Sequence, residues 1–176
     1  MRQLLDRLSH LFPILDAHEQ RDDLSFITVS PGHVRALLHH LREHEGCNHL
    51  VLLTAVDWLE DGQFQLTYLL HDRPRARDIG LRCFIDRGHA TMESIHDMWP
   101  AAATYQRELK EMFGIDFPGS PRLNEPFILE GWVEIPPYRR DFDTKAFSER
   151  TFNHRPGRIT HDPALHMKQK LYPDEA

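Results

Sequence analysis

Two histidines and a glutamate occur together as His40, Glu43 and His44, in the spacing His-x-x-Glu-His. Two histidines four residues apart on a helix could hold zinc, and the glutamate could act as the general base of a hydrolase. On the helix predicted below, however, both histidines lie at the flank of an apolar stripe that begins at Val34, and Glu43 points to solvent. A chain with 13 histidines also produces such a match easily by chance. A solvated helix face is therefore the first interpretation, and a small zinc hydrolase using these three residues is a remote alternative.

The cysteines and the remaining motifs point away from a bound cofactor. Cys47 and Cys83 are the two cysteines, whereas a cubane iron–sulfur cluster normally takes four thiolates. Two buried thiols are a simpler interpretation than a disulfide. The sequence has no glycine-rich nucleotide motif and no Gly-x-Ser-x-Gly nucleophile motif. We predict no catalytic residue, no metal site and no cofactor in this chain.

Composition and charge describe an ordinary folded chain with an uneven charge distribution. Its 176 residues suit one domain with an appended arm, and 40% apolar with 27% charged residues is typical of a soluble globular protein. No apolar run approaches the roughly 20 residues of a membrane helix, and no secretory signal is apparent. Residues 1–137 carry a net charge of −8 and residues 138–176 carry +2. This distribution disfavours nucleic-acid binding, which needs a concentrated basic face, and suits a tail that lies on another protein.

Hydrophobic periodicity and turn residues predict the elements of residues 1–114. Leucines at helical spacing predict a first helix that Pro13 ends, and Ser30-Pro31 predicts the start of a second, with Ser30 as its N-cap. Asp61-Gly62 is a strong hairpin signal, and Gly114 is a natural helix end. We predict an α+β fold, a mixed or antiparallel sheet with helices packed on one face. The predicted helices cover 1–11, 30–46 and 100–113, the predicted strands cover 24–29, 49–58, 63–71 and 78–85, and 91–98 is a short helix or loop.

The character of the chain changes after Gly114. Residues 115–176 hold eight of the 12 prolines, so long helices and central strands are excluded. Residues 115–144 are too apolar for a solvated linker, since they include Phe127, Ile128, Leu129, Trp132, Tyr138 and Phe142, whereas beyond residue 144 a disordered tail is an equal alternative. We therefore predict a compact domain over 1–114 and an extended C-terminal arm over 115–176 that docks on partner subunits. On the preceding helix, Arg107 and Glu111 are expected to form a weak pair on a solvated face.

The stretch 103–119, Ala-Thr-Tyr-Gln-Arg-Glu-Leu-Lys-Glu-Met-Phe-Gly-Ile-Asp-Phe-Pro-Gly, resembles the signature of a known family. That family is the respiratory complex I 30 kDa subunit, also called the C subunit of NADH-quinone oxidoreductase. The resemblance extends to the strand at 52–57, its partner at 65–70, the stretch 95–100, Trp132 and the segment 137–142. Gln106, Lys110-Glu111 and Ser120 depart from the signature, as expected for a divergent branch.

The resemblance implies a subunit without redox centres of its own, on the cytoplasmic face of a membrane and joined to it only through the complex. Implied partners are a large subunit related to the [NiFe] hydrogenase catalytic subunit (complex I 49 kDa type), a small iron–sulfur subunit and a ferredoxin-like iron–sulfur subunit. The host could instead be an energy-converting [NiFe] hydrogenase or a formate hydrogenlyase-like complex, and a free-standing binding domain is a further alternative. The residues expected at the partner interface are Arg107, Glu108, Phe113, Gly114, Phe117, Trp132, Tyr138, Arg139, Arg140 and Asp141.

Overall fold

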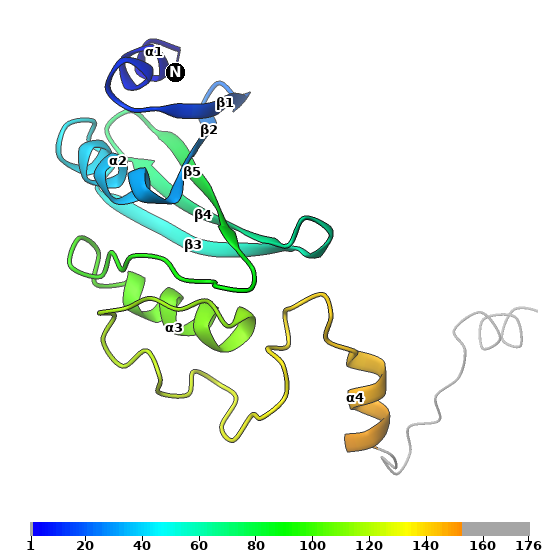
Figure 1. Ribbon diagram of the computed structural model, residues 1–176. Coiled ribbons are helices and arrows are strands. Elements are labelled where there is room, and N and C mark those ends of the chain that lie inside the picture. The colour runs from blue at the N-terminus through cyan, green and yellow to red at the C-terminus, as the bar shows by residue number, and fades with distance from the viewer. Residues whose placement is uncertain (1, 153–176) are drawn as a thin grey trace, which may run out of the picture. The chain divides into compact units, whose positions relative to one another are not determined.

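The computed structural model describes residues 2–152, and those up to Phe142 fold around one five-stranded sheet (Figure 1). The strands lie in the order β1-β2-β5-β4-β3, and all neighbours are antiparallel except β2 and β5, which are parallel. The predicted α+β class with a mixed sheet is confirmed. The elements are α1 (Arg2–Leu11), β1 (Ile14–Arg21), β2 (Leu24–Val29), α2 (Pro31–Glu43), β3 (His49–Trp58), the short 3-10 helix η1 (Leu59–Asp61), β4 (Gln63–Asp72), β5 (Arg77–Asp86), α3 (Ala102–Phe113) and α4 (Thr144–Thr151).

Most predicted elements occur within a residue or two of their expected bounds, but β1 was missed. This strand lies at the edge of the sheet and all of its residues after Ile14 are exposed. It therefore lacks the alternation of apolar and polar residues by which a half-buried strand is recognised. Ser30 is the N-cap residue of α2, as predicted, but its hydroxyl lies 2.7 Å from His33 Nδ1 and makes no capping hydrogen bond.

The hairpin predicted at Asp61-Gly62 is present and joins β3 to β4. The chain turns through η1, and Gly62 then takes the left-handed conformation at φ +64°, which glycine adopts without steric cost. The pairing of Trp58 with Gln63 fixes the register. Because side chains alternate along a strand, this register assigns the residues from Leu52 to Trp58 and their partners in β4 alternately to the two faces of the sheet, whereas the pairing shifts between Leu50 and Leu52.

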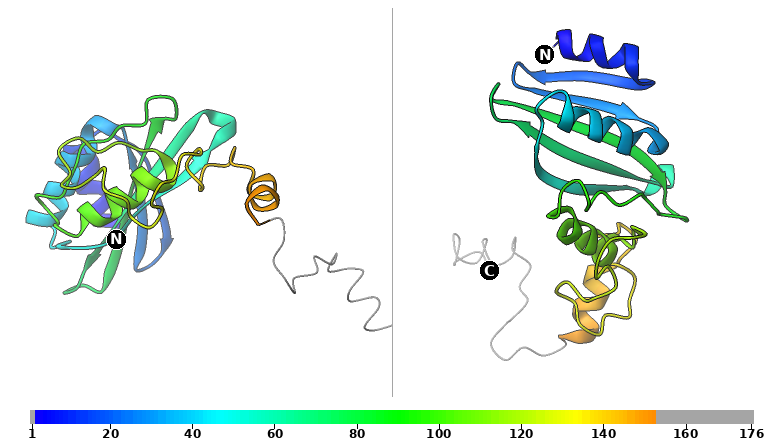
Figure 2. Two further views of the ribbon diagram at one scale, coloured as in Figure 1. Left: turned by 90° about the horizontal axis from the view of Figure 1, so that it is seen from below. Right: turned by 90° about the vertical axis from the view of Figure 1, so that its left-hand side faces the viewer.

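Helices α1, α2 and α3 pack on the same face of the sheet (Figure 2), as predicted. The core between them takes alternate residues of the central strands, for example Phe64, Leu66, Tyr68 and Leu70 of β4. The opposite face of the sheet has half-buried and exposed side chains in the same strands. No helix within residues 2–152 is long and apolar enough to cross a membrane.

Residues up to Phe142 form one compact unit, and a second unit begins at Asp143. In the second unit Asp143 caps α4, since its Oδ1 accepts a hydrogen bond of 2.9 Å from the Ala146 amide. The predicted division after Gly114 and the docking of residues 115–176 as an arm stay predictions. Part of that stretch, residues 153–176, lies outside the described residues.

Candidate partner interface

Gly114 directs the chain out of α3 and into the segment 115–142. Its φ of +81° is left-handed, and the Gly114 amide closes the helix on the Lys110 carbonyl at 3.0 Å. A Cβ on Gly114 would lie 3.3 Å from Pro136 Cγ, so the later part of the segment passes directly over the turn. Ile115 and Phe117 follow and are fully buried. The start of the segment is thus part of the core.

The Glu111 carboxylate holds the middle of the segment. It accepts three consecutive backbone hydrogen bonds, from Phe127 at 2.6 Å, Ile128 at 2.8 Å and Leu129 at 3.1 Å. Hydrogen bonds to an ionised carboxylate are about twice as strong as neutral ones. The expected pair of Arg107 with Glu111 was wrong, because Glu111 serves these amides instead. Arg107 lies 4.0 Å from Glu125 and over the Phe127 ring at 5.5 Å.

A buried carboxylate, Asp57 at the end of β3, holds the last part of the segment. Its oxygens accept hydrogen bonds from Arg87 at 2.9 and 3.2 Å and from the Arg140 amide at 2.8 Å. Arg87 also binds Asp141 at 2.6 Å, and Arg140 pairs with Glu60. We call Asp57, Glu60, Arg87, Arg140 and Asp141 the Asp57 cluster.

The protonation of Asp141 depends on this cluster. Burial by itself raises the pKa of Asp141, but the hydrogen bond from Arg87 and the charges of Arg87 and Arg139 together outweigh it, and the pKa lies below its ordinary value. The pKa of Arg87 is raised, chiefly by its hydrogen bonds to Asp57. The charged forms of both side chains are therefore favoured, and they bind the end of the segment to β3.

The segment is bound by its backbone while several apolar side chains face outward. Beside the contacts above, the Tyr138 amide donates a 3.0 Å hydrogen bond to the Met112 carbonyl of α3. Yet Tyr138 is 58% exposed, Ile128 66%, Val133 92% and Ile135 43%. We call these four residues the apolar strip. Exposed apolar residues grouped along one segment are typical of a protein–protein interface, whereas single ones are common on any surface.

Some of the residues predicted for the interface position the segment after α3, and others lie within that segment. Phe113 and Phe117 are buried, and with Gly114 they position the segment. Tyr138 stacks its ring edge-on against Phe113 at 5.7 Å, and Trp132 lies 5.6 Å from Phe142 between ring centroids. A role for these residues at an interface stays a prediction.

The charged members of the predicted set lie mainly against the chain itself. Arg139 lies 3.6 Å from Asp141 and 5.7 Å from the Phe64 ring centroid. Glu108 is half-buried on α3. Glu111, Asp57 and Arg87 were not predicted as positioning residues, because nothing local in the sequence relates positions 57 and 87 to position 140. These contacts depend on tertiary structure.

The histidine pair of α2 has a packing role. The rings of His40 and His44 lie 4.9 Å apart, and His40 packs edge-on against Phe12 at 5.3 Å. Burial, and then the charge of His44, lower the pKa of His40. Glu43 lies 3.4 Å from Arg42. Within residues 2–152 no group of three potential ligands is placed to hold a metal ion.

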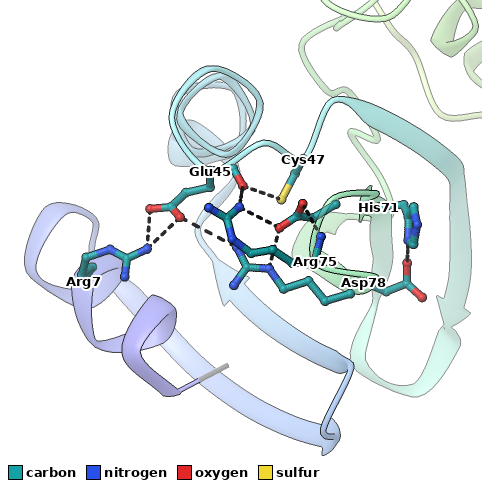
Figure 3. Close-up of polar contacts among 8 residues, drawn as sticks. Arg7, Glu45, Cys47, His71, Arg75 and Asp78 are labelled. Atoms are coloured by element: carbon teal, nitrogen blue, oxygen red, sulfur yellow. Dashed lines mark hydrogen bonds and ion pairs between the residues drawn. The ribbon is translucent and has the colours of Figure 1, made fainter.

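A second network of charges lies at the other end of β4 (Figure 3). Asp72 is fully buried and accepts hydrogen bonds from Arg75 at 3.0 Å and Arg77 at 2.8 Å. Glu45, just after α2, binds Arg7 of α1 through both oxygens, at 2.7 and 2.9 Å. We call these five residues the Asp72 cluster.

The charged groups of the Asp72 cluster have a structural role. Burial by itself raises the pKa of Asp72, but the hydrogen bonds from Arg75 and Arg77 and the charge of Arg77 together outweigh it, and the pKa lies below its ordinary value. The neighbouring Cys47 is fully buried, and burial raises its pKa to about 12. A thiol with that pKa is almost wholly protonated near neutral pH and is a poor nucleophile.

Comparison with known proteins gives one consistent family. Residues 27–148 match the family described as "Respiratory-chain NADH dehydrogenase, 30 Kd subunit". Over 142 residues the chain is 34% identical to the C subunit of NADH-quinone oxidoreductase from Moorella thermoacetica, covering 81% of this chain and 95% of the relative. It is 31% identical over 122 residues to a C/D subunit of NADH-quinone oxidoreductase from Aquifex aeolicus, covering 69% of this chain and 20% of that longer protein.

A solved structure has the same fold over nearly the whole chain. It is a chain of the membrane-bound sulfane sulfur reductase, an archaeal respiratory membrane complex. The superposition has a TM-score of 0.82 at 25% sequence identity, and it covers 92% of this chain and 96% of the other. The likeness therefore extends well beyond the segment that carries the family signature.

Proposed function

Because the chain belongs to the 30 kDa subunit family of respiratory-chain NADH dehydrogenase, we propose that it is a non-catalytic assembly subunit that docks on a larger subunit of its complex. The chain is thus a 30 kDa-type subunit of a respiratory or related membrane complex. In our proposal electron transfer runs through neighbouring subunits, and this subunit holds them together.

One observation carries the docking proposal: the backbone is hydrogen-bonded to the chain's own carboxylates at residues 127–129 and 140, while the apolar strip faces out. A segment fixed in this way loses little further conformational freedom when a partner covers it, so more of the burial energy remains as affinity. Burying apolar surface contributes about 25 cal/mol per Å² before such costs. The strip is therefore a preorganised docking surface.

The relatives support the choice of partner. The name of the Aquifex aeolicus protein joins the C and D subunits in one chain. We propose that the larger partner of this chain is of the D type, which is the large subunit related to the [NiFe] hydrogenase catalytic subunit. We further propose that this chain contacts the small iron–sulfur subunit and the ferredoxin-like iron–sulfur subunit.

Co-purification with a charge placed on the strip tests this proposal. The full chain is tagged in its own host, and Ile128→Asp with Val133→Asp is compared with the unchanged chain. Burying two carboxylates in an interface is costly, so recovery of the large subunit should fall about tenfold or more. Mass spectrometry of the recovered proteins measures it.

Leu15→Asp is the matched control, because Leu15 is 68% exposed on the edge strand β1 and receives the same change. Both variants should unfold at the temperature of the unchanged chain, since the altered side chains are exposed. Undiminished recovery of the large subunit with the strip variant would contradict docking through the strip. The absence of a large subunit with the unchanged chain would contradict the assembly role itself.

A second host is favoured by the structural likeness to the sulfane sulfur reductase chain. In this second proposal the chain belongs to a complex of the energy-converting hydrogenase type rather than to an NADH-quinone oxidoreductase. The proteins that co-purify with the tagged chain distinguish the two. NADH-oxidising subunits favour the quinone reductase, and a large subunit with two Cys-x-x-Cys nickel motifs favours the hydrogenase type.

A further inference from the structure

The face of the sheet opposite the helices, which we call the outer face, carries at its centre Arg82, which forms no ion pair within residues 2–152. On this face the strand register places Thr28, Arg82, Thr67 and Thr54 side by side across β2, β5, β4 and β3. The Arg82 guanidinium lies 3.7 Å from the Phe26 ring centroid. Its Nε is buried and has no hydrogen-bond partner among residues 2–152.

Phe26 holds Arg82 in place. The Phe26 ring lies across Gly80 of the neighbouring strand, so closely that a Cβ on Gly80 would come within 2.3 Å of the ring. The ring therefore occupies the space that a side chain at position 80 would fill, and the guanidinium stacks on the ring. A stacked arginine has little freedom left, so it loses little more when a carboxylate binds.

Arg82 differs from the other arginines of the sheet. Arg77 and Arg87 each bind a buried carboxylate. Asp16 of β1 lies near enough to attract Arg82, but it forms no ion pair with it. Burial lowers the pKa of Arg82 and outweighs the effect of Asp16. A partly desolvated cation without an acceptor has a strong electrostatic reason to take one.

Next to Arg82 on the outer face lies an apolar corner formed by Val56, Trp58 and Phe84. Their exposed fractions are 43%, 41% and 38%. Phe84 is two residues from Arg82 on β5, about 7 Å along the strand, and Val56 lies across β4 from Phe84, so the corner borders the guanidinium.

The polar side chain inside this corner is held by two hydrogen bonds. Gln65 accepts a 3.2 Å hydrogen bond from Trp58 Nε1 and donates one of 3.3 Å to Thr67 Oγ1. The Gln65 oxygen and one of its two amide N–H groups therefore keep their partners when the corner is covered. A partner that covers the corner can bury apolar surface without breaking the hydrogen bonds of Gln65. The Arg82 guanidinium beside the corner can then bind an anion.

From this arrangement we propose that the outer face is a second docking surface, which binds a segment of another subunit that presents a carboxylate to Arg82 and apolar side chains to Val56, Trp58 and Phe84. The occupant is an acidic, apolar peptide segment of a partner chain. This surface is separate from the apolar strip, and the inference rests on the proposed function only in that the partner belongs to the same complex.

Site-specific photo-crosslinking in the assembled complex tests the inference. A photoreactive amino acid replaces Val56 in the full tagged chain, and the complex is isolated and irradiated. The expected product joins position 56 to a partner peptide that contains Asp or Glu. Arg82→Glu in the same chain should reduce this product about tenfold or more, because it replaces the attraction by repulsion.

Arg73→Glu is the matched charge-reversal control, since Arg73 is exposed in the turn between β4 and β5, at the end of these strands opposite the apolar corner, and it should leave the product unchanged. Thermal unfolding of each variant checks its folding, and Thr67→Glu, which leaves Arg82 and Phe26 in place, provides a second repulsive change. A crosslink to a second copy of this chain or to its own residues 153–176 would overturn the proposal. A crosslinked product that Arg82→Glu and Thr67→Glu leave undiminished would also overturn it. So would the absence of any crosslinked product.

The result is distinguishable from failure of the proposed function. If the tagged chain recovers its large subunit but gives no crosslink at position 56, only the outer-face proposal fails. If the chain recovers no partner, the assembly role fails first.

Discussion

The Asp72 cluster and the Asp57 cluster lie at opposite ends of β4 and share one construction, a buried carboxylate held by arginine. They differ in what they join. The Asp72 cluster joins α1, the end of α2 and the turn between β4 and β5, all within residues 7–77. The Asp57 cluster joins β3 and β5 to residues 140 and 141, at the end of the segment after α3.

The same kind of buried ion pair can therefore stabilise either the whole sheet with its helices or one peripheral segment. A cluster whose members come from the sheet and its helices contributes to global stability. A cluster that reaches a peripheral segment controls the position of that segment and can be broken with less effect on the sheet. We expect the two clusters to respond differently to the same substitution.

The largest effect is expected for Asp72→Asn. The change removes the anion that Arg77, with a side chain 13% exposed, binds at 2.8 Å, and leaves it only the more distant Glu45 at 3.9 Å. Removing one partner of a buried ion pair typically costs about 3–5 kcal/mol. Chemical denaturation of the full chain measures the loss in the free energy of unfolding, and Asp22→Asn, an exposed change in the turn between β1 and β2, should alter it by less than about 0.5 kcal/mol. A loss for Asp72→Asn no larger than for this control would remove the distinction between the clusters.

A smaller global effect is expected for Asp57→Asn, of about 1–3 kcal/mol, because Arg87 keeps Asp141 as a partner. The specific result is release of the segment. Tryptic cleavage at Arg139 and Arg140 should become several times faster than in the unchanged chain, whereas Asp72→Asn, at conditions where it is folded, should not accelerate these cuts selectively. Equal acceleration in both variants would mean that the clusters have the same role.

The smallest effect concerns pH and the Asp141 side chain. Since the pKa of Asp141 is lowered in the folded chain, its contribution is present above the ordinary aspartate pKa of about 3.9 and is lost as pH falls through the lowered value. Protonation there should free residues 139–141, which hydrogen exchange of their amides can follow. Asp141→Asn should remove this acid dependence, and an unchanged pH profile in that variant would contradict the assignment.

The sequence by itself determined the fold class and most of the sheet. Alternating apolar residues predicted β3, β4 and β5, and Gly62 and Gly114 marked two chain reversals that need left-handed backbone. These signals are local, because strand periodicity and glycine conformations depend on neighbouring residues. The family signature at 103–119 likewise predicted the family that the comparisons support.

Tertiary structure alone decided which groups meet. Glu111 was expected to pair with Arg107 one helical turn away, but it binds the amides of Phe127, Ile128 and Leu129, which offer three aligned donors. Edge strand β1 and the contact of Asp57 with residue 140 were also not predictable, since the first lacks a buried face and the second spans 83 positions. Local propensity sets the elements, whereas long-range pairing depends on how the packed core brings distant carboxylates and donors together.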